Sequence, residues 1–328
     1  RVPHHGPSGV RPWRAQRGQH VPCLLRDFQG GPAADNGVMQ HNFIANQSTP
    51  ALAGQTLDVL DPSNGQVFDQ IPRSQAADID QAVQAARAAF NGPWGRLTGT
   101  ERGRLLMALS RKVAEHATEL ATLEQRDCGK PTKQAAADAV ALARYFEFYA
   151  GACDKLHGET LPYQNGYSVL TWREPHGVTG HVIPWNYPMQ IFGRSVGGAL
   201  AAGNACVVKP SEDACLSLIR VAQLAAEVGF PAGALNIVTG YGHEAGDLLV
   251  RHPGVDHVSF TGSPRVGQLV VQAAAEHHAP VTLELGGKSP QIIFGDADMD
   301  AMTTVVTNAI VQNAGQTCSA GSRALVHR

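Results

Sequence analysis

The sequence lacks paired cysteines, long apolar runs and an excess of one charge. Its six cysteines are scattered without a CxxC pair, and a chain of 328 residues needs no disulfide framework, so we expect reduced thiols and a cytoplasmic protein. No apolar run approaches the ~20 residues that a bilayer span requires. A formal net charge of -2 gives no overall attraction to nucleic acid or to an anionic membrane. We therefore expect neither kind of partner.

The remaining composition is that of an ordinary globular protein, with 43% hydrophobic and 16% charged residues. The length allows about two domains. The fourteen histidines and the cysteines form no tight cluster at zinc-ligand spacing. The sequence therefore predicts no metal site.

Residues 1–38 differ from the rest of the chain. They contain five Arg and no Lys, five Pro and six Gly, and they have neither a helical period nor the apolar core of a signal peptide. The first methionine is Met39. We expect this segment to be a non-native or disordered extension, such as translated upstream DNA. An Arg-rich transit peptide is the alternative, which so much Pro and Gly disfavours.

Helices dominate the next part of the chain. LDVLDP and QVFDQI flank the turn Ser63-Asn64-Gly65, which predicts a hairpin. Ser74 precedes a one-sided apolar pattern that ends at Asn91-Gly92-Pro93, so it is expected to cap a helix. The same kind of pattern predicts one helix over about 100–126 and another over about 131–152.

A strand–helix alternation begins after a second hairpin signal, Gln164-Asn165-Gly166. Each of four strand-like stretches is followed by a helix-like segment. These stretches lie at about 177–183, 205–209, 234–238 and 255–260. The alternation predicts right-handed βαβ units and a parallel sheet with helices on both faces. Ligands bind such sheets outside the carboxyl ends of the strands.

Polar residues follow two of these strands. In IPWNYP, two prolines fix the backbone around Asn186, so its amide can act as a pre-aligned hydrogen-bond donor; a turn asparagine beside core aromatics is an equal alternative. In KPSE, Lys209 and Glu212 suit the hydroxyls of a ribose. A surface ion pair is the alternative there.

Three later motifs add further candidates. In FTGSPRVG, Gly262 permits a tight turn and Ser263 can cap a helix whose free N–H groups suit a pyrophosphate, although an ordinary connection is the alternative. In ELGGKSP, Glu284 lies before two glycines, and a buried carboxylate there needs a partner, solvent or a function. In GQTCSAGSR, Cys318 taken alone is more typical of an inert buried thiol.

Together these motifs resemble those of the NAD(P)-dependent aldehyde dehydrogenase superfamily in order and approximate spacing, from about Met39 to Arg328. The resemblance implies a Rossmann-like doubly wound α/β fold with a parallel sheet. Its NAD-binding domain would comprise residues 39–155 and 176–286, with a projecting oligomerisation hairpin at 156–175. Residues 287–328 would be only the start of a second α/β catalytic domain.

The resemblance also assigns site residues. It implies that Cys318 is the nucleophile, Glu284 the general base and Asn186 the oxyanion-stabilising amide. The implied cofactor-binding residues are Ile183, Trp185, Lys209, Glu212, Gly242, Gly246, Thr261, Gly262 and Ser263. The expected cofactor is NAD, with NADP as the alternative, because a carboxylate at Glu212 would repel a 2'-phosphate.

The implied reaction oxidises a small-molecule aldehyde to a carboxylic acid. The Cys318 thiolate forms a thiohemiacetal, hydride transfer to the nicotinamide leaves a thioester, and Glu284 activates the water that hydrolyses it. We expect partial burial to raise the pKa of Glu284 for this task.

Relatives in this family continue well beyond their nucleophile, whereas this sequence ends ten residues after Cys318. We therefore expect an incomplete gene or truncated product of a protein that is a homo-oligomer at full length. A strand at about 324–327 should lack partners and expose its edge. Two alternative functions remain: a relative that acylates coenzyme A, which Glu284 disfavours, and a dinucleotide-binding or oligomerising module without catalysis.

Overall fold

The central feature of the computed structural model, which describes residues 39–328, is a seven-stranded sheet in the order β11-β10-β7-β8-β9-β1-β2. The expectation for residues 1–38 lies outside the described residues. The sheet strands are β1 (Asn42–Ile44), β2 (Gln47–Thr49), β7 (Val178–Ile183), β8 (Ala205–Pro210), β9 (Leu235–Ile237), β10 (His257–Gly262) and β11 (Val281–Leu285).

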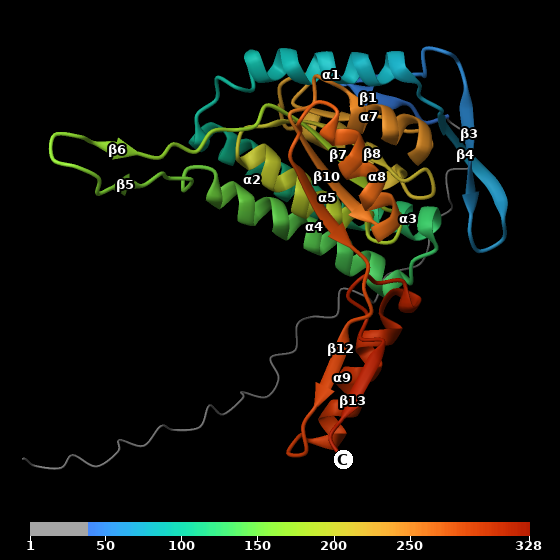
Figure 1. Ribbon diagram of the computed structural model, residues 1–328. Coiled ribbons are helices and arrows are strands. Elements are labelled where there is room, and N and C mark those ends of the chain that lie inside the picture. Colours follow the sequence, from blue (N-terminus) through green and yellow to red (C-terminus); the bar gives the residue numbers. More distant parts are fainter. Residues whose placement is uncertain (1–38) are drawn as a thin grey trace, which may run out of the picture. The chain divides into compact units, whose positions relative to one another are not determined.

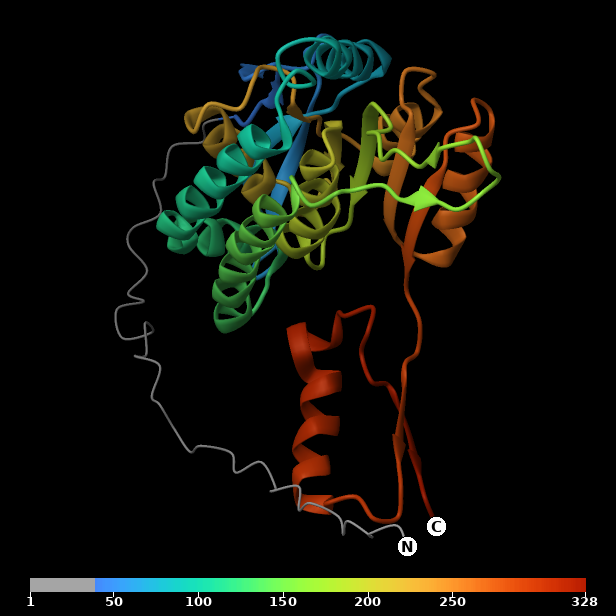
Figure 2. The ribbon, with the colours of Figure 1, turned by 90° about the vertical axis from the view of Figure 1, so that its left-hand side faces the viewer.

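Helices cover both faces of this sheet (Figures 1 and 2). The helices are α1 (Ala76–Asn91), α2 (Gly99–Glu115), α3 (Ala117–Cys128), α4 (Thr132–Ala152), α5 (Pro188–Ala201), α6 (Leu216–Glu227), α7 (Asp247–Arg251), α8 (Pro264–Ala275) and α9 (Met299–Val311). On one face α1 packs against β7, β8 and β9, and α8 packs against β10 and β11. On the other face α5 and α6 contact the strands, and α2, α3 and α4 pack against those two helices. Within the described part of the chain, no helix combines the length and hydropathy that a bilayer crossing demands.

The predicted doubly wound parallel sheet is confirmed. Strands β11, β10, β7, β8 and β9 run parallel, and every residue of β8 and β9 is buried, as expected for a sheet covered on both faces. From β7 the chain builds outward to β8 and β9, then returns to add β10 and β11 on the other side of β7. The strand order therefore reverses between β7 and β10, which is where open α/β sheets bind their ligands.

Two details of the predicted helices are wrong. Ser74 does not cap α1: its hydroxyl is buried and accepts a hydrogen bond from Asn42 Nδ2 at 2.8 Å. The Asp78 carboxylate instead accepts from the N–H of Gln75, at 2.8 Å. The single helix expected over 100–126 is divided into α2 and α3 at His116, whose φ and ψ are -100° and 15°. The apolar residues keep the same helical period on both sides of His116, so the period did not indicate the break.

Within residues 39–328, three pairs of strands lie outside the central sheet. The first predicted hairpin is confirmed as the antiparallel pair β3 (Thr56–Asp61) and β4 (Gln66–Pro72), and the second as β5 (Thr160–Leu161) and β6 (Val169–Leu170). The expectation that residues 324–327 lack partners is wrong, because β13 (Arg323–Val326) pairs in parallel with β12 (Pro290–Ile293). Both strands belong to the segment after β11, so β13 finds its partner, β12, within the same segment.

The apolar stripe of α3 carries a buried carboxyl, Asp127. Its Oδ2 accepts a hydrogen bond from the N–H of Leu216 at 2.8 Å, so Asp127 caps the start of α6 from a neighbouring helix. Burial raises the pKa of Asp127 to about 7, although the N–H groups of Leu216 and Cys215 act to lower it. Asp127 therefore stabilises the fold most when its carboxyl group is protonated.

This raised pKa makes a signed prediction for Asp127→Asn. The contribution of Asp127 is fully present below its unfolded pKa near 3.8 and is lost as pH rises through about 7. The free energy of unfolding of the wild type, minus that of the variant, should fall by on the order of 4 kcal/mol over this range. Urea denaturation at several pH values measures it. Buried His181, whose pKa burial lowers to about 3, acts with the opposite sign but cancels in the difference. A difference that stays constant with pH would contradict the prediction.

Candidate active site

The structure brings the three predicted catalytic residues to one cavity. Asn186 follows β7, Glu284 lies near the end of β11, and Cys318 follows the 3-10 turn Gln312–Gly315. All three line a cavity of about 330 Å³ at the carboxyl ends of the parallel strands. Glu284 is paired in register with Thr261 of β10, which lines the same cavity. A thiol, a carboxylate and an amide therefore share one space at the strand-order reversal.

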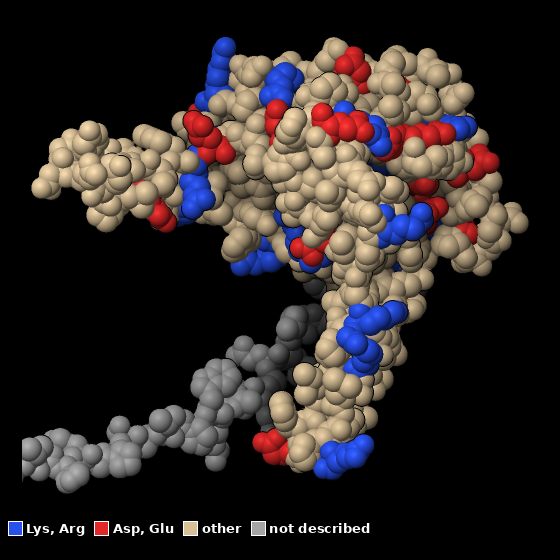
Figure 3. Space-filling view, in the orientation of Figure 1, with Lys and Arg blue, Asp and Glu red and all other residues tan. Residues whose placement is uncertain are grey.

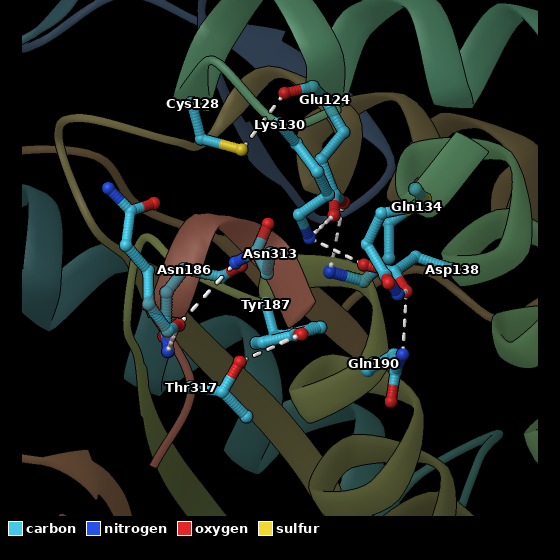
Figure 4. Close-up of polar contacts among 12 residues, drawn as sticks. Glu124, Cys128, Lys130, Gln134, Asp138, Asn186, Tyr187, Gln190, Asn313 and Thr317 are labelled. Carbon is cyan, nitrogen blue, oxygen red and sulfur yellow. Dashed lines mark hydrogen bonds and ion pairs between the residues drawn. The ribbon is translucent and has the colours of Figure 1, made fainter. Parts of the chain in front are cut away.

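Hydrogen bonds join the loop after β7 to the loop that carries Cys318 (Figure 4). The Asn186 Nδ2 donates to the Gln316 carbonyl at 2.9 Å, and the Asn313 Nδ2 donates to the Asn186 carbonyl at 3.0 Å. The Tyr187 and Thr317 hydroxyls lie 3.1 Å apart and share a hydrogen bond. We call these three bonds the loop clamp. Asn313 is buried and has a φ of 50°, a left-handed conformation that asparagine tolerates better than most residues.

The amide of Asn186 has two N–H groups. One of them is used in the loop clamp, which fixes the orientation of the amide beside Cys318. The structure thus fixes the Asn186 amide at the wall of the cavity, and Tyr187 beside it is a buried aromatic residue.

The expected partial burial of Glu284 is wrong. Its side chain is exposed, as are Leu285 and Gly286 beside it. The reason is its position in the sheet: β11 is an edge strand, and within residues 39–328 no strand pairs with its outer side. Its geometry rather than its burial makes Glu284 a candidate base.

Cys318 is the exposed thiol among the five cysteines that the structure describes. Cys206 and Cys215 are buried inside the sheet layers. Burial raises the pKa of Cys206 to about 12 and raises that of Cys215 as well. Because the thiolate is the reactive form, these two thiols are inert in the folded chain.

The nine predicted cofactor-binding residues all line a second cavity, of about 540 Å³. They are Ile183, Trp185, Lys209, Glu212, Gly242, Gly246, Thr261, Gly262 and Ser263. The second cavity shares four of them, Trp185, Thr261, Gly262 and Ser263, with the cavity that holds Cys318. The two cavities are therefore adjacent.

The alternative reading of Lys209 and Glu212 as a surface ion pair is wrong. Only 2% of the Lys209 side chain is exposed, and its Nζ lies 2.7 Å from Glu212 Oε2. Burial acts to raise the pKa of Glu212, but the Lys209 ammonium outweighs it and the net shift is downward. Glu212 Oε1 also accepts from the N–H of Gly242 at 3.4 Å. An ionised carboxylate and a buried ammonium therefore face the second cavity together.

These groups fit a dinucleotide. A Cβ added at Gly242 would meet nothing nearer than Lys209 Nζ at 4.0 Å, so the backbone there faces open space. Ser263 Oγ caps α8 by accepting from the N–H of Val266 at 3.3 Å, and the start of α8 faces the cavity. Hydroxyl-binding side chains, open backbone and a helix start are the features a ribose, an adenine and a pyrophosphate require. Among residues 39–328, no group of three or more His, Cys, Asp or Glu side chains is arranged to hold a metal ion.

Sequence reasoning missed a buried ionic cluster behind this site. Lys130, Glu124 and Asp138, which we call the buried triad, have side chains with no exposed surface. Burial raises the pKa of Glu124 to about 7, against the effect of Lys130. Burial also acts to lower the pKa of Lys130, but the two carboxylates raise it overall. The available signal was that Glu124 and Asp138 interrupt the apolar stripes of α3 and α4.

Comparisons with known proteins give the family of the chain. The model of the aldehyde dehydrogenase family matches residues 50–328. The chain belongs to the aldehyde dehydrogenase family. Aldehyde dehydrogenase family 2 member B4, a mitochondrial protein of Arabidopsis thaliana, is 45% identical over 315 residues, which are 93% of this chain and 59% of that protein.

Solved structures of aldehyde dehydrogenases share the fold. A Burkholderia cenocepacia protein assigned to this class is 70% identical with a TM-score of 0.87, over 88% of this chain and 61% of that one. An NAD+ complex of the Bacillus cereus enzyme is 42% identical with a TM-score of 0.88, over 90% of this chain and 60% of that one. The chain thus spans about 60% of the length of the relatives it matches.

The burial of the cysteines predicts their order of reaction. Iodoacetamide at pH 8 should alkylate Cys318 at least about 100-fold faster than Cys206 and Cys215, because the latter thiols are buried and protonated. Peptide mass spectrometry follows each site separately. Cys318→Ser is the control, in which Cys206 and Cys215 should keep their slow rates. Equal rates at Cys318 and Cys206 in native buffer would contradict the structure.

Proposed function

We propose that the full protein oxidises a small-molecule aldehyde to a carboxylic acid with NAD, and that this chain carries its nucleophile and its cofactor site. One observation carries the proposal. Cys318, Glu284 and Asn186 share a cavity that adjoins the one lined by all nine cofactor-site residues. An aldehyde carbon held at Cys318 would therefore lie between a base, an amide donor and the bound cofactor.

The residues have separate tasks in this reaction. The Cys318 thiolate attacks the carbonyl carbon, and the second N–H of Asn186 donates to the oxygen on which negative charge develops. One such donor contributes about 3 kcal/mol to lowering the barrier. NAD, when bound, supplies the hydride acceptor. Glu284 then takes a proton from water, and the resulting attack on the thioester releases the acid and frees the thiol.

The choice of NAD rests on Glu212. Its carboxylate is ionised and faces the cavity, so it can accept hydrogen bonds from a ribose but repels a 2'-phosphate. The Bacillus cereus relative, 42% identical, is solved as an NAD+ complex. Both observations favour NAD over NADP for this chain.

The hairpin at 156–175 supports assembly of the full protein into a homo-oligomer. Tyr163, Tyr167 and Trp172 on this hairpin are 68%, 69% and 82% exposed. Figure 3 shows few charged side chains on this hairpin. Large exposed aromatic groups of this kind are typical of protein interfaces. We also propose a cytoplasmic location, although the Arabidopsis thaliana relative is named as mitochondrial.

Calorimetric titration with NAD, followed by alkylation of Cys318 with and without NAD, tests the proposal on this chain. NAD binding together with selective labelling of Cys318 supports it. Binding of NAD without a selectively reactive thiol would instead indicate a dinucleotide-binding module. Absence of both NAD binding and selective labelling would overturn the proposal.

The hydrolytic step needs a chain of the relatives' length. We suggest adding the remaining segment of the Burkholderia cenocepacia protein, which is 70% identical. Free acid as the product supports Glu284 as the hydrolytic base. Acyl-CoA without free acid would favour the coenzyme A-acylating alternative.

Cofactor choice gives a further prediction. Glu212→Gln should raise the affinity for NADP relative to NAD by roughly tenfold, because it removes a repelling charge and leaves the Lys209 ammonium to attract the 2'-phosphate. Calorimetry with both cofactors measures the ratio. Glu244→Gln is a matched control, since Glu244 pairs with Arg73 and does not line the cavity. An unchanged ratio in Glu212→Gln would remove Glu212 as the source of discrimination.

A further inference from the structure

The buried triad lies directly behind the loop that carries Asn186 (Figure 4). Lys130 follows α3 and precedes α4, and its ammonium contacts the carboxylates of Glu124 and of Asp138, the latter at 2.5 Å. The same ammonium lies 4.4 Å from the centre of the Tyr187 ring. A fully buried lysine is rare unless it is paired, and this one has two anionic partners and an aromatic face.

The second oxygens of the triad's carboxylates hold the first turn of α5. The N-cap residue of α5, Tyr187, makes no capping bond with its own side chain. Glu124 Oε2 supplies the acceptor instead, 3.3 Å from the N–H of Met189. Asp138 Oδ1 accepts from Gln190 Nε2 at 2.6 Å. Carboxyl oxygens that accept hydrogen bonds at a helix start are favourable, so the triad fastens the beginning of α5 from two sides.

From the start of α5, contacts continue to the nucleophile. The Tyr187 ring rests on Lys130, and its hydroxyl bonds to the Thr317 hydroxyl, one residue before Cys318. Asn186 adds the other bonds of the loop clamp. An unbroken chain of contacts therefore runs from Lys130 through Tyr187 and Thr317 to Cys318.

We propose that Lys130 is a positioning residue for the nucleophile, acting through Tyr187 and the loop clamp. Apolar groups often replace a buried ionic cluster without loss of stability, so stability alone does not explain an ammonium at this place. The ammonium fixes the position of the Tyr187 ring, and the hydroxyl of this ring bonds to the loop that carries Cys318. The proposal rests on the assignment of Cys318 as the nucleophile.

The test compares Lys130→Met with Asp127→Asn in the 328-residue chain. Asp127 is a matched control, because it is a buried carboxyl of the same helix as Glu124 but is bonded to α6 rather than α5. The measurement, made well below the melting temperature, is hydrogen exchange of the amides at 313–320.

In Lys130→Met we expect exchange at 313–320 to become about tenfold faster, because the loop clamp opens more often. Asp127→Asn should lose stability below about pH 7, where Asp127 stabilises the fold, without faster exchange at 313–320. If Lys130→Met changed only stability, as the control does, Lys130 would be purely structural and the proposal overturned.

Two further variants keep the test decisive if Lys130→Met does not fold. The combined variant Lys130→Met, Glu124→Gln and Asp138→Asn leaves no unpaired charge, and should show the same faster exchange. Tyr187→Phe keeps the ring on Lys130 and removes only the bond to Thr317, so it should also speed exchange at 313–320. Adding Lys130→Met to Tyr187→Phe should give less than the product of the separate effects. Independent, fully multiplicative effects would overturn the link through Tyr187.

These outcomes are separable from the fate of the proposed function. Hydrogen exchange needs neither NAD nor a catalytic reaction. A chain that fails to bind NAD but shows the predicted exchange would refute the function and keep the connection between Lys130 and the loop. A chain that binds NAD and labels Cys318 selectively, with unchanged exchange in every variant, would keep the function and refute the positioning role.

Discussion

The loop clamp is the interaction on which the arrangement of the site depends. Asn186, Tyr187 and Asn313 connect two loops that are about 130 residues apart in the sequence. Without these bonds, Cys318 would belong to a segment whose helix α9 buries no residue and whose strand β13 is exposed throughout. The clamp therefore places the Cys318 thiol, from a poorly buried segment, against the edge of a well-buried sheet.

The sheet provides the other half of this arrangement. Because β7 and β10 are neighbours at the strand-order reversal, the loop carrying Asn186 and the turn at Gly262 emerge side by side. Each side is backed by a buried lysine, Lys209 at the cofactor cavity and Lys130 behind Asn186. Both ammonium groups are paired with carboxylates, as burial of a charge requires. The buried ion pairs thus support the residues on both sides, Glu212 and Asn186, that face the open cavities.

The sequence predicted most of the fold and the members of the candidate site, for identifiable reasons. Strands such as β8 are continuous apolar runs, a pattern typical of parallel strands covered on both faces. Motifs at the strand ends marked Asn186 and Glu284, because the strand ends of such a sheet converge. Cys318 was assigned through the resemblance to the aldehyde dehydrogenase superfamily. What failed depended on contacts distant in sequence. The Ser74 hydroxyl bonds to Asn42 rather than to its own helix. The apolar residues keep the same helical period on both sides of the break at His116.

Sequence reasoning missed both the exposure of Glu284 and the burial of the triad, because neither follows from the pattern of apolar residues. Glu284 was expected to be partly buried because a catalytic carboxylate needs a low-polarity setting, but an edge strand offers it no cover. Glu124 and Asp138 lie on helical stripes that read as simple core, yet an ammonium from the intervening loop turns them into a charged cluster. Periodicity reports which face of a helix is buried, not which polar groups meet there. The side chains that hold Cys318 in place are of this second kind, so their role emerges only when three separate segments are seen together.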